Sequence, residues 1–291
     1  MIPYDDFGGR GPVLHFSHPN AYTPRCFRRF LTPFTAHHRV IAARHRALWY
    51  LSPDAPVVAS ADAFDDWNLI ADDLLRFLDQ QRLEGIIGVG HSLGAVATMK
   101  AALREPQRFR ALVLIEPVFL PPAILDAARA HPQAAAEQPF VLAARRRRDR
   151  WPDRQAAFDR YRQKRVFANF PNETLWDYVN EALHPDATTG EVALSFPRDW
   201  EAAFYAHPPL DVWDEIPRLT LPTLAVRGVA SDTLFPDAWA LWQNAQPSAA
   251  FVEMSEVGHM LTLEAPDDAA AVVLHWLADQ ALSVSESDGS P

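Results

Sequence analysis

The sequence predicts an α/β fold with a mostly parallel sheet and helices on both of its faces, and two observations carry this prediction. Short continuous apolar segments alternate with longer segments in which apolar residues recur at a helical period. This alternation stops once, over residues 117–210, and then resumes. Parallel strands are buried on both sides, so they appear in a sequence as continuous apolar runs.

The first part of the chain contains the elements that establish the alternation. The longest helical segment spans residues 62–81. Its apolar residues, among them Trp67, Ile70 and Leu74, recur at offsets of three and four and therefore share one face. The expected strands are residues 13–16, 40–43, 85–89 and 111–115, and the expected helices are residues 25–34, 62–81 and 92–104.

Residues 117–210 interrupt the pattern with helical segments and no convincing strand. The alternation returns with expected strands at residues 223–226 and 250–254, and it ends in an amphipathic helix. A helical insertion within one sheet is the sequence form of a lid. We expect a core of residues 1–116 and 211–282 with its last helix at residues 266–282, a lid of residues 117–210, and a disordered tail of residues 283–291.

Composition excludes several classes of protein. The 291 residues carry a net charge of −10, which argues against a protein that binds nucleic acid. No apolar run is long enough to span a membrane, and the first residues do not resemble a secretory signal. Cys26 is the one cysteine, so neither an intrachain disulfide nor a thiolate zinc cage can form. We expect a cytoplasmic protein without a metal site, since the adjacent His37 and His38 make a poor metal pair.

The segment Gly90-His91-Ser92-Leu93-Gly94 has the pattern G-x-S-x-G where an expected strand turns into an expected helix. The turn is so tight that bulky side chains beside the serine would collide, which explains the glycines. It would raise the Ser92 hydroxyl above the carboxyl edge of the sheet. It would also place the Leu93 N–H at a helix N-terminus, ready to donate to an oxyanion. The pattern alone also arises by chance, so its partners decide the interpretation.

A serine needs a base to become a nucleophile, and the base needs an acid to orient it. In this class of fold the chain order is serine, acid, histidine. Asp232 and His259 each follow an expected strand, at the carboxyl ends where open α/β sheets bind ligands. The sequence therefore predicts a triad of Ser92, Asp232 and His259. Glu116, which ends the strand before Pro117, is the alternative acid.

Taken together, these residues resemble the α/β-hydrolase superfamily over almost the whole chain, from about residue 11 to residue 282. The resemblance rests on the segment around Ser92, the loop at Asp232 and the Gly258-His259 loop. It implies that the helical lid is inserted after the sixth core strand. Members cleave carboxylic esters, thioesters and lactones. Epoxide hydrolases and haloalkane dehalogenases typically carry aspartate in place of the serine, so Ser92 favours acyl-serine chemistry.

The resemblance also implies a second oxyanion donor after the first long strand. There the sequence reads His18-Pro19-Asn20-Ala21, similar to a subgroup with His-Ala-Asn-Gly-Phe, but with Ala21 in place of the glycine. This difference leaves the second donor open between the N–H of Asn20 and that of Ser17. The candidate substrate-pocket residues are His18, Tyr22, His91 and Trp200.

A strongly basic segment lies inside the expected lid. Residues 145–165 hold ten Arg or Lys and three Asp, although the whole chain is acidic. One interpretation is a solvated helical face stabilised by pairs four residues apart. Another is recruitment of an anionic substrate, such as a carboxylate or a phosphate-bearing acyl carrier. An interface with another subunit is a third.

The function predicted from these residues is that of a serine hydrolase. It would cleave a carboxylic ester, thioester or lactone of a small, largely apolar acyl substrate through an acyl-enzyme, with no cofactor. A perhydrolase or acyltransferase with the same triad differs only in the acceptor. A non-catalytic ligand-binding protein of the same fold is the alternative from another class.

Overall fold

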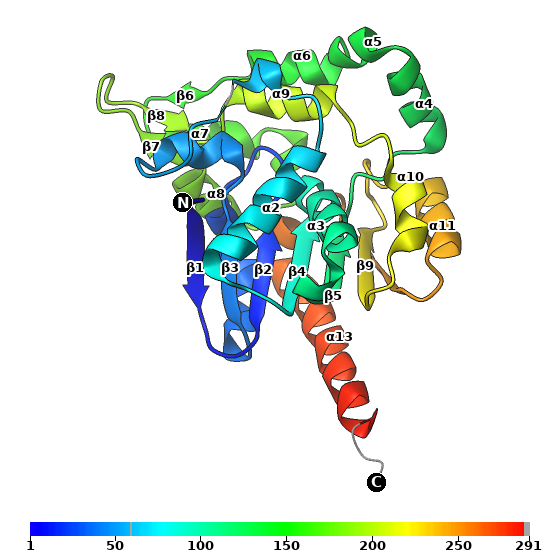
Figure 1. Ribbon diagram of the computed structural model, residues 1–291. Coiled ribbons are helices and arrows are strands. Elements are labelled where there is room, and N and C mark those ends of the chain that lie inside the picture. Colours follow the sequence, from blue (N-terminus) through cyan, green and yellow to red (C-terminus); the bar gives the residue numbers. More distant parts are fainter. Residues whose placement is uncertain (59, 288–291) are drawn as a thin grey trace.

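The computed structural model describes residues 1–58 and 60–287, the side chains of residues 281–287 excepted, and it is built on a seven-stranded sheet (Figure 1). The strand order is β1-β3-β2-β4-β5-β9-β10. Neighbouring strands pair in parallel except β1 and β3, which are antiparallel. The strands are β1 (Tyr4–Gly8), β2 (Val13–Ser17), β3 (Arg39–Ala43), β4 (Ile86–His91), β5 (Phe109–Ile115), β9 (Thr223–Gly228) and β10 (Ala250–Met254).

All six strands expected in the sheet are present, and β1 is an addition. Its sequence begins with Tyr4, Asp5 and Asp6, so it lacks the apolar run by which buried strands are found. The Asp5 carboxylate is buried nevertheless, because Arg25 and Arg44 both donate to it. With β1 included, five strands of the sheet precede the insertion. The expectation that it follows a sixth core strand is therefore wrong for the described chain.

Helices cover both faces of the sheet, with α2 and α3 in front and α13 behind it in the view of Figure 1. The helix expected at residues 25–34 is broken into three short turns, because Pro24 and Pro33 cannot donate a backbone hydrogen bond. The core helices and turns are η1 (Pro24–Phe27), α1 (Arg28–Leu31), η2 (Thr32–Ala36), η3 (Arg46–Leu51), η4 (Ala61–Ala63), α2 (Asn68–Gln81), α3 (Leu93–Arg104), η5 (Pro106–Arg108), α10 (Val212–Glu215), η7 (Ile216–Arg218), α11 (Pro236–Ala245), α12 (Leu261–Glu264) and α13 (Pro266–Ser287).

Residues 117–210, here called the cap segment, lie over the end of the sheet at which the parallel strands finish (Figure 1). The segment is mainly helical, but it also contains a three-stranded antiparallel sheet of order β6-β8-β7, which the sequence did not indicate. Strands of two or three residues are too short to show a period. The elements are α4 (Pro122–Ala130), α5 (Pro132–Ala136), α6 (Pro139–Arg146), β6 (Arg150–Trp151), α7 (Arg154–Arg162), η6 (Arg165–Phe167), α8 (Asn172–Glu181), β7 (Leu183–Pro185), β8 (Val192–Leu194) and α9 (Arg198–Ala206).

The end of the chain differs from the expected division into helix and tail. Helix α13 continues past residue 282 to Ser287. Of the tail expected to be disordered, residues 288–291 lie outside the described residues.

Candidate active site

Ser92 occupies a sharp turn between β4 and α3. Its backbone has φ 56° and ψ −119°, a conformation that residues with a side chain rarely adopt. The Ser92 N–H donates to the Ile115 carbonyl of the neighbouring strand at 2.9 Å, which fixes the turn to the sheet. The strain is thus held by the surrounding structure, as the sequence pattern predicts for a serine raised above a strand end.

The glycines on either side of Ser92 are required by close backbone approaches. A Cβ atom at Gly90 would lie 2.5 Å from the Cα of Ala95 in the first turn of α3. A Cβ at Gly94 would lie 2.0 Å from the Ser17 carbonyl oxygen at the end of β2. The second contact also shows that the segment after β2 lies directly against the start of α3.

A continuous chain of hydrogen-bonding groups starts at the Ser92 hydroxyl. The Oγ atom lies 3.0 Å from Nε2 of His259, and Nδ1 of the same ring lies 2.9 Å from Oε2 of Glu116. A base within hydrogen-bonding reach of a hydroxyl, itself oriented by a carboxylate, is the arrangement that activates a serine nucleophile. The structure therefore brings together Ser92 and His259, and it gives the third place to Glu116.

Glu116 is a fully enclosed carboxylate with a donor for each oxygen. It follows β5, which lies between β4 and β9, and its side chain is 0% exposed. The Gly228 N–H donates to Oε1 at 2.7 Å, and the Ser231 hydroxyl donates to Oε2 at 2.6 Å. These donors compensate the burial of the charge and fix the carboxylate toward His259.

Asp232, the acid first expected from the sequence, does not contact His259. Its side chain is 66% exposed and forms an ion pair at 3.1 Å with Arg165 of the cap segment. The neighbouring Ser231 points inward instead, to Glu116. The prediction of Asp232 as the partner of His259 is therefore corrected to the alternative acid. Glu116 follows β5, the sheet neighbour of β4, which carries the serine.

His91 connects the serine turn to the loop that carries His259. Its Nε2–H donates to the His259 carbonyl oxygen at 2.9 Å, and its Nδ1 accepts from the Thr262 hydroxyl at 2.9 Å. Burial lowers the pKa of His91 to about 3, so the ring is neutral and can both donate and accept. With no exposed surface and both nitrogens occupied, His91 is not a pocket residue, contrary to its prediction.

His18 is likewise enclosed rather than open to a substrate. Its Nδ1–H donates to the Pro19 carbonyl oxygen at 3.0 Å, and its Nε2 accepts from the His45 N–H at 3.1 Å. Burial holds the pKa of His18 well below its usual range. The prediction of His18 as a pocket residue is therefore also wrong. It fixes the shape of the segment after β2.

The other two candidate pocket residues are buried among aromatic rings. Tyr22 packs against Phe27 and Tyr178, and Trp200 packs against Phe64 and Phe204. Each is 7% exposed, and their contact with a substrate stays a prediction.

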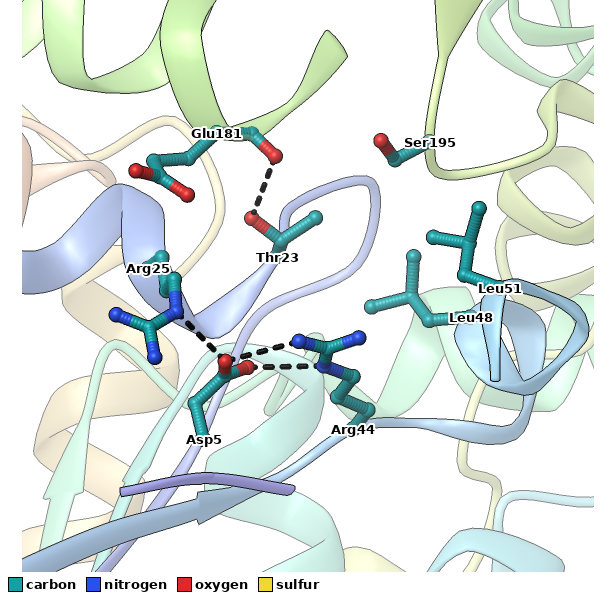
Figure 2. Close-up of a pocket in the computed structure, with 8 residues that line it drawn as sticks. All are labelled: Asp5, Thr23, Arg25, Arg44, Leu48, Leu51, Glu181 and Ser195. Atoms are coloured by element: carbon teal, nitrogen blue, oxygen red, sulfur yellow. Dashed lines mark hydrogen bonds and ion pairs between the residues drawn. The ribbon is translucent and has the colours of Figure 1, made fainter. Parts of the chain in front are cut away.

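Two small cavities occur away from Ser92 within the described residues. One, of about 70 Å³, lies where the core meets the cap segment, with Asp5 and Arg44 on its core side (Figure 2). The other, of about 10 Å³, lies beside His15. Neither is lined by Ser92, His259 or Glu116, and Ser92 itself is 6% exposed. Ser92 is thus largely buried in this conformation, while the His259 side chain beside it is 18% exposed.

Residues 1–58 and 60–287 contain no group of three or more His, Cys, Asp or Glu side chains that could hold a metal ion. In the same part of the chain, the helices are too short or too polar to cross a membrane.

Comparison with protein families places this geometry in a known fold. The profile described as "alpha/beta hydrolase fold" matches residues 33–266, which include Ser92, Glu116 and His259. The chain belongs to the alpha/beta hydrolase family. Residue 33 lies after β2, so the match does not include the segment around Asn20.

Similar proteins are distant in sequence but close in fold to this alpha/beta hydrolase. An abhydrolase domain-containing protein, AKT2 of Alternaria alternata, is 22% identical over 66% of this chain and 82% of its own. Polyketide synthase ThaQ of Burkholderia thailandensis is 27% identical over 97% of this chain, which is 12% of the synthase. Among solved structures, a thioesterase domain from the curacin biosynthetic pathway has a TM-score of 0.75 at 18% identity, covering 93% of this chain and 94% of that one.

A second solved structure has the same degree of similarity. E-2-(acetamidomethylene)succinate hydrolase has a TM-score of 0.74 at 19% identity and covers 94% of each chain. At such identities the likeness shows the fold, and site residues have to be argued from this alpha/beta hydrolase's own geometry.

Sequence reasoning missed two groups that hold the site together. Ser231 lies in the loop after β9 and Thr262 lies in the short helix α12, and each hydroxyl donates to a residue of the Ser92–His259–Glu116 chain or its support. Hydroxyls are common at such positions, so their presence carried no signal. Glu116 did carry one, because a carboxylate directly after a buried apolar strand must find partners at the sheet edge.

Proposed function

We propose that this alpha/beta hydrolase cleaves a carboxylic ester or thioester through an acyl-enzyme on Ser92. His259 takes the Ser92 proton through Nε2 as Oγ attacks the carbonyl carbon, and it then gives the proton to the leaving group. Glu116 holds the Nδ1–H tautomer and stabilises the imidazolium. Water, activated by the same histidine, then hydrolyses the acyl-enzyme and regenerates the serine.

The single observation that supports this proposal is the pair of contacts on either side of the His259 ring, 3.0 Å to Ser92 Oγ and 2.9 Å to Glu116 Oε2. The strained turn at Ser92 adds to it, since strain of this kind is retained where function requires it. In this arrangement each of the two ring nitrogens has one partner of the kind that the mechanism requires.

The proposal assigns the oxyanion hole to two backbone donors. Leu93 is the first residue of α3, and a first-turn N–H has no acceptor within its own helix. Asn20 lies in the segment that follows β2, whose last residue Ser17 pairs with Gly90. Because Ser17 is within the sheet and Asn20 is beyond it, we assign the second donor to Asn20.

The cap segment acts as the lid in this proposal. Ser92 is 6% exposed, and we propose that residues of the cap segment or its neighbouring loops move to admit a substrate. Closure then excludes water from the oxyanion and strengthens the hydrogen bonds to it.

Active-site labelling with a fluorophosphonate probe, followed by mapping of the labelled peptide, tests the proposal. We expect labelling at Ser92 that is lost in Ser92→Ala and His259→Ala, together with turnover of p-nitrophenyl esters by the unmodified protein. Turnover by a clean Ser92→Ala preparation at the wild-type level would overturn it. A folded protein that is neither labelled nor active would instead support a ligand-binding role.

Two similar proteins favour a thioester as the bond that is cleaved. One is named as the thioesterase domain of the curacin pathway, and the other is a region of a polyketide synthase, whose acyl chains are carried as thioesters in general, that aligns with nearly all of this chain. Comparing kcat/KM for an acyl N-acetylcysteamine thioester and the p-nitrophenyl ester of the same acyl group tests this preference. Adding methanol or peroxide to the same assay distinguishes hydrolysis from acyl transfer and perhydrolysis by the products formed.

A further inference from the structure

The segment of residues 18–23, here called the oxyanion segment, is fixed to the core at its first residue. The His18 ring and the His45 backbone share a hydrogen bond, and Nε2 of His45 donates to the His18 carbonyl oxygen at 2.7 Å. The two rings also lie 3.8 Å apart. This end of the segment therefore has its position set by the core.

The remainder of the oxyanion segment is bound to the cap segment. The Asn20 side-chain Nδ2 donates to the Glu201 carbonyl oxygen of α9 at 3.1 Å. The Thr23 hydroxyl donates to the Glu181 carbonyl oxygen of α8 at 3.2 Å, and it also contacts Cys26 Sγ at 3.3 Å. Tyr22 packs against Tyr178 of α8. Two cap helices thus hold the segment that contains the proposed second oxyanion donor.

The cap side of the Asn20 contact is itself held in place. The Glu201 carboxylate forms an ion pair with Arg147, which also approaches the hydroxyls of Tyr161 and Tyr178 at 3.4 Å. Both charged groups are largely buried, so the pair is poorly screened by solvent. The carbonyl that receives Asn20 therefore belongs to a fixed part of α9.

Two features of the oxyanion segment lower the stability of the folded protein, so a role other than stability would account for them. Asn20 Oδ1 is buried and has no hydrogen-bond partner among the described residues, and a buried unsatisfied acceptor is destabilising. Ala21 has φ 69°, a left-handed conformation that an alanine side chain disfavours. An alanine at position 20 would remove the first cost, but it would also remove the bond to the Glu201 carbonyl oxygen.

We propose that Asn20 is a positioning residue whose side chain, bonded to the Glu201 carbonyl of α9, holds its own backbone N–H toward the oxyanion. The proposal rests on the proposed function. Docking of the cap segment and completion of the oxyanion hole then occur together.

The substitution Asn20→Ala tests this directly, because it removes the side-chain bond and leaves the backbone N–H present. We expect kcat for a p-nitrophenyl ester to fall by roughly 10- to 100-fold, less than the loss of a complete donor, with KM nearly unchanged. We also expect an unchanged or higher melting temperature, since the unsatisfied Oδ1 is gone. Asn20→Asp, which sets an oxygen against the Glu201 carbonyl, should lower kcat at least as much.

A boronic acid inhibitor gives a readout that a merely structural role would not change. The inhibitor forms a tetrahedral adduct with a nucleophilic serine, so its affinity depends on the oxyanion donors. In Asn20→Ala its inhibition constant should rise by the same factor by which kcat/KM falls.

Tyr50→Phe is the matched control. The Tyr50 hydroxyl donates to the Ser195 carbonyl oxygen at 2.8 Å. Like Asn20, Tyr50 is a core residue whose side chain binds a carbonyl of the cap segment, but it lies outside the oxyanion segment. Its kcat should remain close to that of the wild type.

The outcomes separate this inference from the proposed function. If the wild type is labelled at Ser92 and active, then an unchanged kcat in Asn20→Ala, or equal losses in Asn20→Ala and Tyr50→Phe, would overturn the positioning role alone. If the wild type shows neither labelling nor turnover, the proposed function itself fails.

Discussion

The loops after β5 and β9 each carry a carboxylate at the same edge of the sheet, and their environments are opposite. Glu116 is 0% exposed and accepts hydrogen bonds from a backbone N–H, a serine hydroxyl and the His259 ring. Asp232 is 66% exposed and has a single, still more exposed arginine as its partner. Both come between Ser92 and His259 in the chain. Order along the chain therefore does not decide which carboxylate reaches the histidine.

Replacing each of the two carboxylates by its amide, in Glu116→Gln and Asp232→Asn, tests this comparison. Of all the variants discussed, Glu116→Gln should have the largest effect. In Glu116→Gln we expect kcat/KM to fall by ~10³–10⁴-fold, because the amide keeps the size but no longer stabilises the imidazolium. In Asp232→Asn we expect a change within about two-fold, since an exposed ion pair contributes little. Steady-state hydrolysis of a p-nitrophenyl ester measures both. A larger loss in Asp232→Asn would reverse the assignment.

The contrast between buried and exposed side chains also applies to the histidines, and it predicts that the free energy of unfolding decreases at acid pH. Burial lowers the pKa of His15 and His91 to about 3 and that of His45 to about 4. Unfolding returns each to about 6.5, so below that pH the unfolded chain binds more protons than the folded one. Stability is complete above pH 6.5 and is lost as the pH falls toward 4, by about 2 kcal/mol for each histidine between pH 6.5 and 5.

Urea unfolding at pH 7.5 and 5.0 measures this loss. His91→Asn should reduce the difference between the two pH values, whereas His275→Asn, which removes an 83% exposed imidazole, serves as the control. Equal free energies of unfolding at the two pH values in the wild type would contradict the enclosure of these histidines.

Ser231→Ala sharpens the comparison within the loop after β9. The hydroxyl donates to Glu116 at 2.6 Å, while the next side chain along, Asp232, points to the cap segment. Loss of a hydrogen bond to a buried carboxylate should lower kcat by about tenfold. The same ester assay measures it, and a Ser231→Ala protein as active as the wild type would show that the remaining donors suffice to orient Glu116.

Arg165→Ala should have the smallest effect. Its side chain is 89% exposed, so the ion pair with Asp232 is well screened and its loss should shift the melting temperature by no more than about 2 °C. Thermal unfolding followed by circular dichroism measures the shift. A shift of many degrees would mean that this pair fixes the cap segment to the core.

Much of the core could be predicted because its signals are local. The run at residues 85–89 and the pattern around Ser92 together give β4, the tight turn and α3, since a buried strand and crowding glycines both leave a mark in the sequence. The strands of the cap segment leave none, because two or three residues cannot show a period. Prolines explain why residues 25–34 form separate turns, although the apolar spacing suggests one helix.

The candidate site was predictable in part for the same reason. Ser92 and His259 follow from motif and order, and their contact in the structure agrees with that prediction. The acid was not determined, because Glu116 and Asp232 both end strands and both satisfy the order. Choosing between them requires the three-dimensional contacts of the two side chains, Glu116 with His259 and Asp232 with Arg165. His91 and His18 illustrate the reverse difficulty, since a polar residue beside a nucleophile can face the interior and bind backbone groups instead.

The burial of Cys26 beside Thr23 makes the reactivity of its thiol a measure of local opening. Cys26 is the sole cysteine of the chain, and its thiol is 1% exposed. Burial raises its pKa to about 12, so a thiol reagent finds almost no thiolate while the fold is intact. The rate at which a chromogenic disulfide reagent modifies Cys26 therefore reports how often the local structure opens and exposes residues 23–26. No label has to be introduced. A substrate analogue that closes the cap segment should lower the rate at which the Cys26 thiol is modified.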